Sequence, residues 1–205
     1  MEHFKLKTYD SNTVIFSGQY NSFLECLEDA ALSGLPLAGL DLKHQNLTNA
    51  NLDGASLIRA DFTGANLTGA NLSEAYLQGG IFENTSLFNT CFCYSDLRSC
   101  DFRSASFGGT DITGANISHS TFSSLSCFDL DFWHTDNMDG CRYINPNGTI
   151  SPMSQKPIII KGLMNTPILI LDHDVHIGAG NFPKQSLDKI LALTTRNAQE
   201  VQKIM

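Results

Sequence analysis

The chain has 205 residues, of which 42% are hydrophobic, and its formal net charge at pH 7 is −8. This length allows one elongated unit with a small appended domain. No run of residues approaches the roughly 18 apolar positions that a membrane span needs, so we expect no membrane contact. The acidic balance argues against direct binding to nucleic acid. The first residues include Glu2 and Asp10 instead of a basic and apolar signal, which predicts a cytoplasmic protein.

Residues 1–34 are predicted to form a small N-terminal unit. Residues 4–9 and 13–16 are strand-like runs around a short polar turn, which predicts a β-hairpin. Ser22 and Glu25 have the S-x-x-E spacing of a capping box, and they predict the start of a short amphipathic helix. The first turn of a repeating β structure exposes unpaired backbone groups, so we expect this unit to cap the repeating part of the chain, which begins at residue 35.

Residues 35–134 repeat every five residues, twenty times, without an insertion or deletion. In most units a small residue stands two places before an apolar central one. A period of five fits neither an ordinary strand nor a helix, and such repetition is typical of a solenoid. The central residues are Leu37, Leu42, Leu47, Leu52, Leu57, Phe62, Leu67, Leu72, Leu77, Phe82, Leu87, Phe92, Leu97, Phe102, Phe107, Ile112, Ile117, Phe122, Cys127 and Phe132.

Several units read Ala-Asn-Leu or Ala-Asp-Phe, among them residues 50–52, 60–62 and 70–72. These units resemble the pentapeptide-repeat family, whose consensus is A-[DN]-L-x-x. The resemblance implies a mainly β fold, a right-handed quadrilateral β-helix with four units per coil and about five coils, which we assign to residues 35–136. Residues twenty apart would then lie above one another. One inward column predicts a stack of rings in the core: Leu42, Phe62, Phe82, Phe102 and Phe122.

The five-residue register fails at Asn137, where a core residue is expected. We therefore assign residues 137–205 to a separate small β+α appendage. Its expected elements are strands at residues 157–161, 167–171 and 175–177 and a helical pattern that begins at Pro183. Residues 162–180 look like a tail found on small pentapeptide-repeat proteins of phages and prophages, which implies a phage or prophage origin.

No nucleophile elbow, phosphate-binding loop or dinucleotide fingerprint occurs in the sequence, so we expect a protein that is not an enzyme and has no cofactor. Residues 172–176 crowd two imidazoles and two carboxylates, but His173 and His176 would point to opposite faces of an extended strand. A site near His173 is the enzymatic alternative. Cys91 and Cys93 form a C-x-C pattern, a weak metal signal because no matching pair follows at zinc spacing, so we expect no metal.

Charge is distributed unevenly, with a net −3 in residues 1–34, −6 in residues 35–134 and +1 in residues 135–205. In the four-sided arrangement Asp41, Asp61 and Asp101 form one outer column, and Asp111 and Asp131 lie on another, all expected to face solvent. Acidic columns of this kind resemble those of family members that bind DNA gyrase by occupying its DNA-binding saddle. The resemblance implies a basic protein partner, such as a type II topoisomerase or a defence nuclease.

Outward-facing aromatic residues, chiefly Phe88 and Tyr94, predict a second candidate surface for a partner or a homodimer contact. The sequence thus favours a non-enzymatic, protein-binding rod that inhibits or modulates a host protein through an acidic, DNA-mimic-like surface. The alternative is a scaffold or adaptor that binds through its aromatics and its C-terminal appendage.

Overall fold

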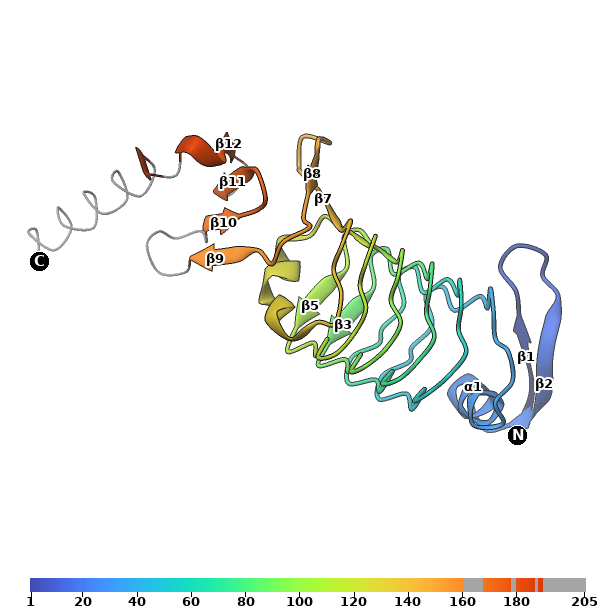
Figure 1. The fold of residues 1–205 in the computed structure, drawn as a ribbon. Helices are drawn as coiled ribbons and strands as arrows, with labels where there is room; N and C mark the ends of the chain where they lie inside the picture. The colour runs from blue at the N-terminus through green and yellow to red at the C-terminus, as the bar shows by residue number, and fades with distance from the viewer. Residues whose placement is uncertain (161–167, 178–179, 187, 190–205) are drawn as a thin grey trace, which may run out of the picture.

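The structure is a computed structural model that describes residues 1–160, 168–177, 180–186 and 188–189. Figure 1 shows a rod of stacked turns, with a hairpin and a helix at one end and a small sheet beyond the other. The described residues are mainly β. In this described part of the chain, no helix combines the length and the apolar character needed to cross a membrane.

Three elements precede the rod: β1 (Glu2–Lys7), β2 (Val14–Tyr20) and α1 (Phe23–Leu32). β1 and β2 pair in antiparallel fashion, as the sequence predicts. Ser22 Oγ accepts a hydrogen bond from Glu25 N at 3.0 Å, and the Glu25 carboxylate accepts one from Asn21 N at 2.9 Å, which is the predicted capping box. The hairpin joins the rod where Asp41 N donates to Lys7 O at 2.8 Å.

Residues twenty apart pair in parallel along the rod. Asn51 bridges Asn71, Asn71 bridges Cys91, and Cys91 bridges Asp111. Four five-residue segments therefore complete one turn, which we call a coil. Where the pairing is longest it forms short strands: β3 (Ser86–Phe88) with β5 (Ser106–Gly108), and β4 (Asp101–Phe102) with β6 (Thr121–Phe122). Two 3-10 helices come next along the chain: η1 (Leu125–Asp129) and η2 (Phe132–His134).

The apolar residue at the centre of each segment is buried, with exposed fractions of 0 to 4%. The rings of Phe62, Phe82, Phe102 and Phe122 stack with centroids 4.7, 4.9 and 5.2 Å apart and planes within 16° of parallel. This is the predicted aromatic column. Phe92 meets Phe82 edge-on at 5.8 Å, so the rings of two columns interlock. Each such pair adds about 0.5–1.5 kcal/mol beyond area burial.

The second inward position of each segment is small, and where it is polar its hydroxyl has a backbone partner. Thr85 Oγ1 donates to the carbonyl of Phe62 at 2.8 Å, and Thr90 Oγ1 donates to that of Leu67 at 2.8 Å. Ser120 Oγ makes the equivalent bond at 2.7 Å. Because these bonds run between coils, a buried Thr or Ser replaces Ala without leaving an unsatisfied group.

A one-residue bulge explains the register break at Asn137. Asp136 N donates to Ala115 O at 3.0 Å, whereas Ile117 N donates to Asn137 O at 2.8 Å, so two residues oppose Asn116. An extra residue of this kind disrupts a ladder locally without ending it.

The coil pairing therefore continues beyond the expected boundary at residue 136. The inward positions resume one residue late, with Met138 6% and Tyr143 1% exposed. β7 (Arg142–Ile144) pairs in parallel with β6, and β8 (Ile150–Pro152) then pairs with β7 in the antiparallel direction. Residues 137–144 thus belong to the rod and not to the appendage.

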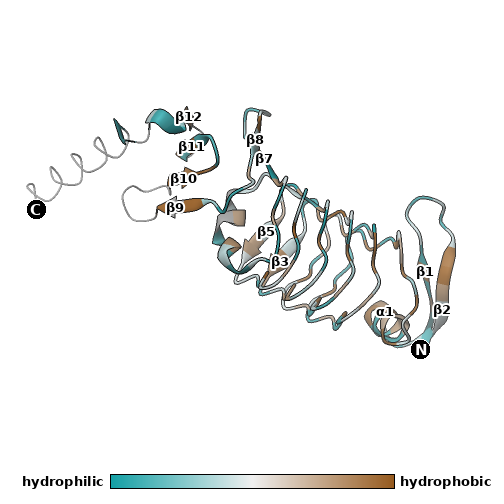
Figure 2. Cartoon of the chain, viewed as in Figure 1, coloured by the Kyte–Doolittle hydropathy of each residue, from teal (hydrophilic) through white to brown (hydrophobic). Residues whose placement is uncertain are grey.

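The C-terminal part is a separate four-stranded antiparallel sheet in the order β12-β11-β10-β9. Its strands are β9 (Ile158–Ile160), β10 (Ile168–Ile170), β11 (Asp174–Ile177) and β12 (Gly180–Pro183). The first three match the predicted strands, and Figure 2 shows the hydrophobic character of β9. The helical pattern predicted from Pro183 begins with η3 (Lys184–Ser186), and most of it lies outside the described residues.

Burying a charge in the aromatic column should unfold the rod. We expect Phe82→Asp to abolish the cooperative thermal transition, because the carboxylate would have no partner among the rings. Phe82→Leu is the matched control, since Leu42 occupies an equivalent buried position, and it should cost only about 1–2 kcal/mol. Circular dichroism during heating measures both. An unchanged melting curve for Phe82→Asp would contradict the inward orientation.

Candidate protein-binding surface

The predicted column of Asp41, Asp61 and Asp101 exists, but most of its charge is neutralised. Parallel bridges connect Asp41 to Asp61, Asp61 to Ile81, and Ile81 to Asp101. Asp61 is only 5% exposed, and its carboxylate lies 3.3 Å from Lys43 Nζ. The expectation that all three aspartates face solvent is therefore wrong for Asp61.

Asp61 is buried because its neighbours satisfy its carboxylate. That carboxylate accepts hydrogen bonds from the backbone N and the hydroxyl of Thr63 at 2.9 and 2.6 Å. Arg103 binds Asp101 through Nε at 2.9 Å and Nη2 at 2.6 Å, and also lies 3.5 Å from Glu83. The D-x-R spacing of Asp101 and Arg103 is a sequence signal for this pairing. In this column Asp61 and Asp101 are therefore ion-paired, whereas Asp41 is exposed.

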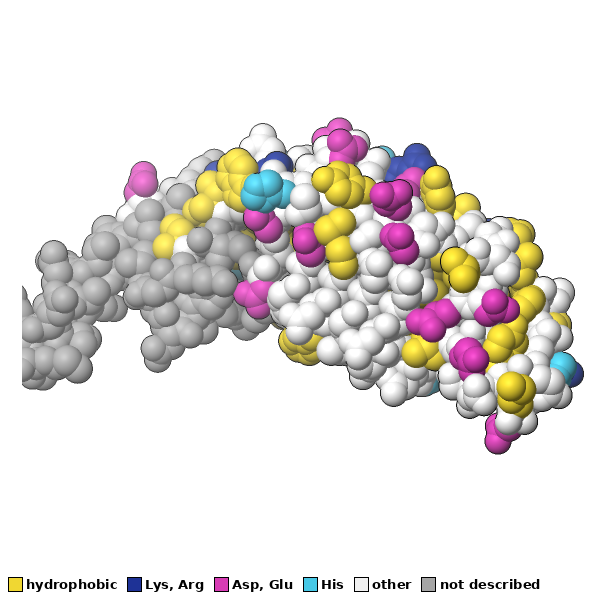
Figure 3. All heavy atoms as spheres, turned by 90° about the horizontal axis from the view of Figure 1, so that it is seen from below, with side chains coloured by type: hydrophobic (Ala, Val, Ile, Leu, Met, Phe, Trp, Pro, Cys, Tyr) yellow, Lys and Arg dark blue, Asp and Glu magenta, His cyan; other side chains and the backbone are white. Residues whose placement is uncertain are grey.

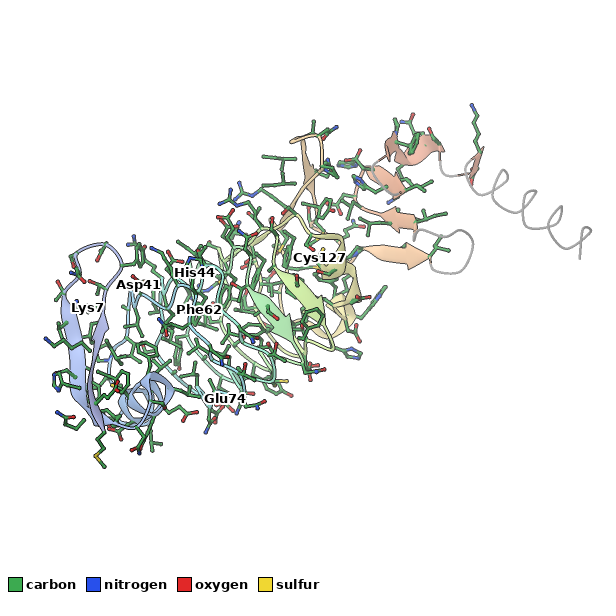
Figure 4. All side chains as sticks on the ribbon, turned by 180° about the vertical axis from the view of Figure 1, so that it is seen from behind. Lys7, Asp41, His44, Phe62, Glu74 and Cys127 are labelled. Carbon is green, nitrogen blue, oxygen red and sulfur yellow. The ribbon has the colours of Figure 1, made fainter. Side chains whose placement is uncertain are left out.

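Acids that share their segment with no Lys or Arg gather instead on the stacked segments 51–55, 71–75, 91–95, 111–115 and 131–135, which we call the acidic face. These segments contain Asp53, Glu74, Asp111 and Asp131 and no Lys or Arg. Figure 3 shows Asp and Glu side chains spread along this side of the rod, and Figure 4 places Glu74 on the opposite side from Asp41. Two of the five predicted aspartates, Asp111 and Asp131, thus lie on the acidic face.

Helix α1 extends the acidic face at its N-terminal end. Glu28 Oε1 accepts a hydrogen bond from Asn51 N at 2.7 Å, which fixes the helix against the first segment. A groove of about 540 Å³ there is lined by acids. The hydrogen bond of Tyr20 to Asp29 raises the pKa of Tyr20 to about 12, so the phenol stays neutral beside them. The lining carboxylates are Glu25, Glu28, Asp29 and Asp53.

Hydrogen bonds keep the two predicted acids of this face ionised. Bonds from Thr113 hold the pKa of Asp111 below its usual range, with its backbone N at 2.9 Å. Asp131 lies 2.6 Å from His134 Nδ1, and that contact lowers the pKa of the carboxyl. In segment 91–95, next to Asp111, the sulfur atoms of Cys91 and Cys93 lie 3.0 Å apart, and burial, together with the hydrogen bond with Cys91, raises the pKa of Cys93 to about 12.

The predicted aromatics are exposed but do not form one patch. Phe88 is 44% and Tyr94 is 68% exposed, and they lie on different segments of the same coil. Each ring rests on a glycine of the next coil: a Cβ at Gly108 would lie 2.6 Å from the Phe88 ring, and one at Gly114 would lie 2.4 Å from that of Tyr94. These glycines give the rings a fixed place on the surface.

The histidines of the appendage do not converge on a site. His173 is exposed, whereas His176 is 4% exposed and packs edge-on against Tyr143 with ring centroids 5.7 Å apart. Burial lowers the pKa of His176, and Asp174 accepts a hydrogen bond from Ser151. Among the described residues, the group with metal-ligand spacing is Cys91, Cys93 and Asp111.

Two family models match the repeat. The one described as "Pentapeptide repeats (8 copies)" matches residues 26–64, and the one described as "Pentapeptide repeat region" matches residues 55–132. Together they span residues 26–132, more than half of the chain. This chain belongs to the pentapeptide-repeat family. No curated protein sequence matches it.

Solved structures of this family resemble the chain to a limited degree. A pentapeptide repeat protein of the Arabidopsis thaliana thylakoid lumen is 28% identical over 51% of this chain and 68% of its own, with a TM-score of 0.41. One from Nostoc PCC 7120 is 23% identical over 62% and 99%, with a TM-score of 0.37. QnrB1, a plasmid-mediated fluoroquinolone resistance protein, is 22% identical over 54% and 68%, with a TM-score of 0.26.

Within this pentapeptide repeat, reversing the charge of Asp61 should destabilise the rod. Asp61→Lys places a second cation beside Lys43 and removes both Thr63 hydrogen bonds, and we expect a loss of about 2–4 kcal/mol. Asp61→Asn is the control, because Asn71 and Asn116 make the same local bonds elsewhere, and it should cost about 1 kcal/mol or less. Urea unfolding measures both. Equal stability of the Lys and Asn variants would show that Asp61 is solvated.

Proposed function

We propose that this protein is a non-enzymatic binding rod whose acidic face docks against a basic surface of another protein. The observation that carries the proposal is the concentration of Asp53, Glu74, Asp111 and Asp131 on stacked segments that contain no Lys or Arg. Attraction between oppositely charged surfaces steers association, and this attraction weakens steeply as the salt concentration rises. The helix α1 adds three carboxylates around a groove that fits a basic side chain.

The charge density supports partial mimicry of DNA. Five stacked segments at about 4.8 Å per coil span about 24 Å. Duplex DNA of that length carries about 14 charges, since one charge falls at about every 1.7 Å. The five segments carry four acids, a little under a third as many, and α1 adds three more at their N-terminal end. A basic groove that holds DNA would therefore attract this face, but less strongly than it attracts DNA.

The finer features of the proposal come from the sequence and from the family resemblance. The platform is a right-handed quadrilateral β-helix of about five coils, capped by residues 1–34. The protein is a phage or prophage factor in the cytoplasm of a bacterial host, and its partner is a nucleic-acid-acting or defence protein, such as a type II topoisomerase or a nuclease. The coils carry no long loop insertion between Leu37 and Phe122, so the docking surface is the face of the coils themselves.

A second candidate function rests on the exposed rings. Phe88 and Tyr94 are held in place over Gly108 and Gly114, so they lose little freedom when a partner covers them. An aromatic adaptor surface, for another protein or for a second copy of this chain, would use these rings. Its binding would depend only weakly on salt, which distinguishes it from acidic docking.

Charge reversal on the acidic face tests the main proposal. The variant Asp53→Lys with Glu74→Lys should keep its fold, because exposed substitutions usually change stability by about 0.5 kcal/mol or less. It should lose the partner that the unchanged protein captures from bacterial lysate. Capture by the unchanged protein should also fall steeply as salt is raised. The control Asp136→Lys with Asp139→Lys makes the same change in net charge at exposed positions elsewhere and should retain the partner.

Three variants separate the competing interpretations. If Asp53→Lys with Glu74→Lys binds like the unchanged protein and Phe88→Ala with Tyr94→Ala does not, the aromatic surface is the binding site. If both variants retain the partner and His173→Ala loses it, the binding site is in the C-terminal sheet, and the proposal fails. Asp111 is left unchanged in these variants, so that their outcome is independent of the thiol cluster beside it.

A further inference from the structure

Stacking of the coils assembles a cluster of three metal-ligating groups on the acidic face. Cys91 and Cys93 flank the buried Phe92 and project from the same segment, with their sulfur atoms 3.0 Å apart. Asp111 lies directly above Cys91, because the two residues form a parallel bridge between neighbouring coils. The two sulfur atoms and a carboxylate oxygen of Asp111 all lie within 4.8 Å of one another.

The same two surface positions hold a hydrogen-bonded polar pair in other coils. Asn71 accepts from the Ser73 hydroxyl at 2.7 Å, and Asn116 accepts from that of Ser118 at 2.8 Å. The repeat geometry therefore brings these side chains together whatever their chemistry. In the segment of residues 91–95 both positions are cysteine. The repeat geometry therefore brings together two sulfur ligands at this place.

We propose that Cys91, Cys93 and Asp111 bind a thiophilic divalent cation of the zinc type. Two thiolates and a carboxylate match the donors that zinc takes, and three protein ligands leave a fourth position open. At Zn–S distances of about 2.3 Å the sulfur atoms of a tetrahedral site are about 3.8 Å apart, so the thiols need to separate only slightly. Binding exchanges the thiol protons for the cation.

The surroundings fit a cation in two further ways. Ser73 Oγ, from the coil below, lies 3.2 Å from the Cys91 sulfur and adds an oxygen donor beside the thiols. The cluster also lies on the acidic face, between Glu74 and Asp131, where the summed negative charge attracts cations. The linear C-x-C pattern predicts no metal because the third ligand is twenty residues away and belongs to another coil.

The experiment uses Co²⁺ as a spectroscopic probe and Zn²⁺ as its competitor on the full chain under reducing, air-free conditions. The unchanged protein should take up one Co²⁺ per chain with thiolate-to-cobalt charge-transfer absorption, which Zn²⁺ abolishes. Zn²⁺ should also raise the melting temperature and protect two thiols from alkylation. The other four cysteines are 0 or 1% exposed and should not react in the native state.

Matched variants identify the ligands. Cys91→Asn with Cys93→Ser reproduces the pair Asn71 and Ser73, so it should fold and bind no Co²⁺. Asp111→Asn should weaken Zn²⁺ binding by about tenfold or more, since even outer-shell changes cost about 10–100-fold. Asp53→Asn removes the same charge from the same face and should bind Zn²⁺ like the unchanged protein. Mg²⁺, which prefers oxygen ligands, should not compete.

Three results would overturn the proposal. The unchanged protein could take up no more Co²⁺ than the Cys91→Asn, Cys93→Ser variant, and this result would show that the thiols form no metal site. Equal Zn²⁺ affinities for Asp111→Asn and Asp53→Asn would remove the carboxylate from the ligand set. A disulfide between Cys91 and Cys93 that persists in the reduced sample, seen by mass spectrometry, would assign the thiols to redox chemistry instead.

Discussion

Backbone hydrogen bonds between coils hold the rod together, and they require the same length for every coil. Leu67 N donates to Ser86 O at 2.9 Å, and Leu72 N donates to Cys91 O at 2.8 Å, with the same offset along the chain. A coil of this size admits one large and one small inward side chain per segment. The stacked phenylalanines and the buried hydroxyls of Thr85 and Thr90 both satisfy this constraint. Where one extra residue enters at Asp136 and Asn137, the chain makes a bulge and keeps the ladder.

The same constraint decides the surface chemistry, because it places residues twenty apart beside one another. Asp61 meets Lys43 from the coil below, and Cys91 meets Asp111 from the coil above. Charge on such a rod therefore depends on the column as well as on the local sequence. In one column Asp61 and Asp101 are ion-paired, whereas the segments of the acidic face contain no Lys or Arg. Basic groups reach the acidic face at Asp131, which lies beside His134 and near Lys156.

The five-residue period was sufficient to predict the core, since each inward position is fixed by it. It also placed the aspartates in columns. It could not show that Asp61 is buried, because that depends on Lys43 and Thr63 together. The D-x-R spacing could have shown that Asp101 is paired. β8 and β12 were not predicted because each contains a proline and neither has the run of β-branched residues that predicted β9, β10 and β11. The thiol cluster was not predicted because a linear motif does not include a ligand from another coil.

The two ends of one column affect whether a second copy of the rod can stack on this one. The column runs from Asp41 to Arg142 by parallel pairing. At its first coil, Asp41 N already donates to Lys7 O beside the hairpin, and at its last, β8 lies antiparallel to β7 and contains Pro152. A strand that is already paired, or that carries proline, is a poor template for another strand. End-to-end stacking of two rods along this column into a filament is therefore disfavoured.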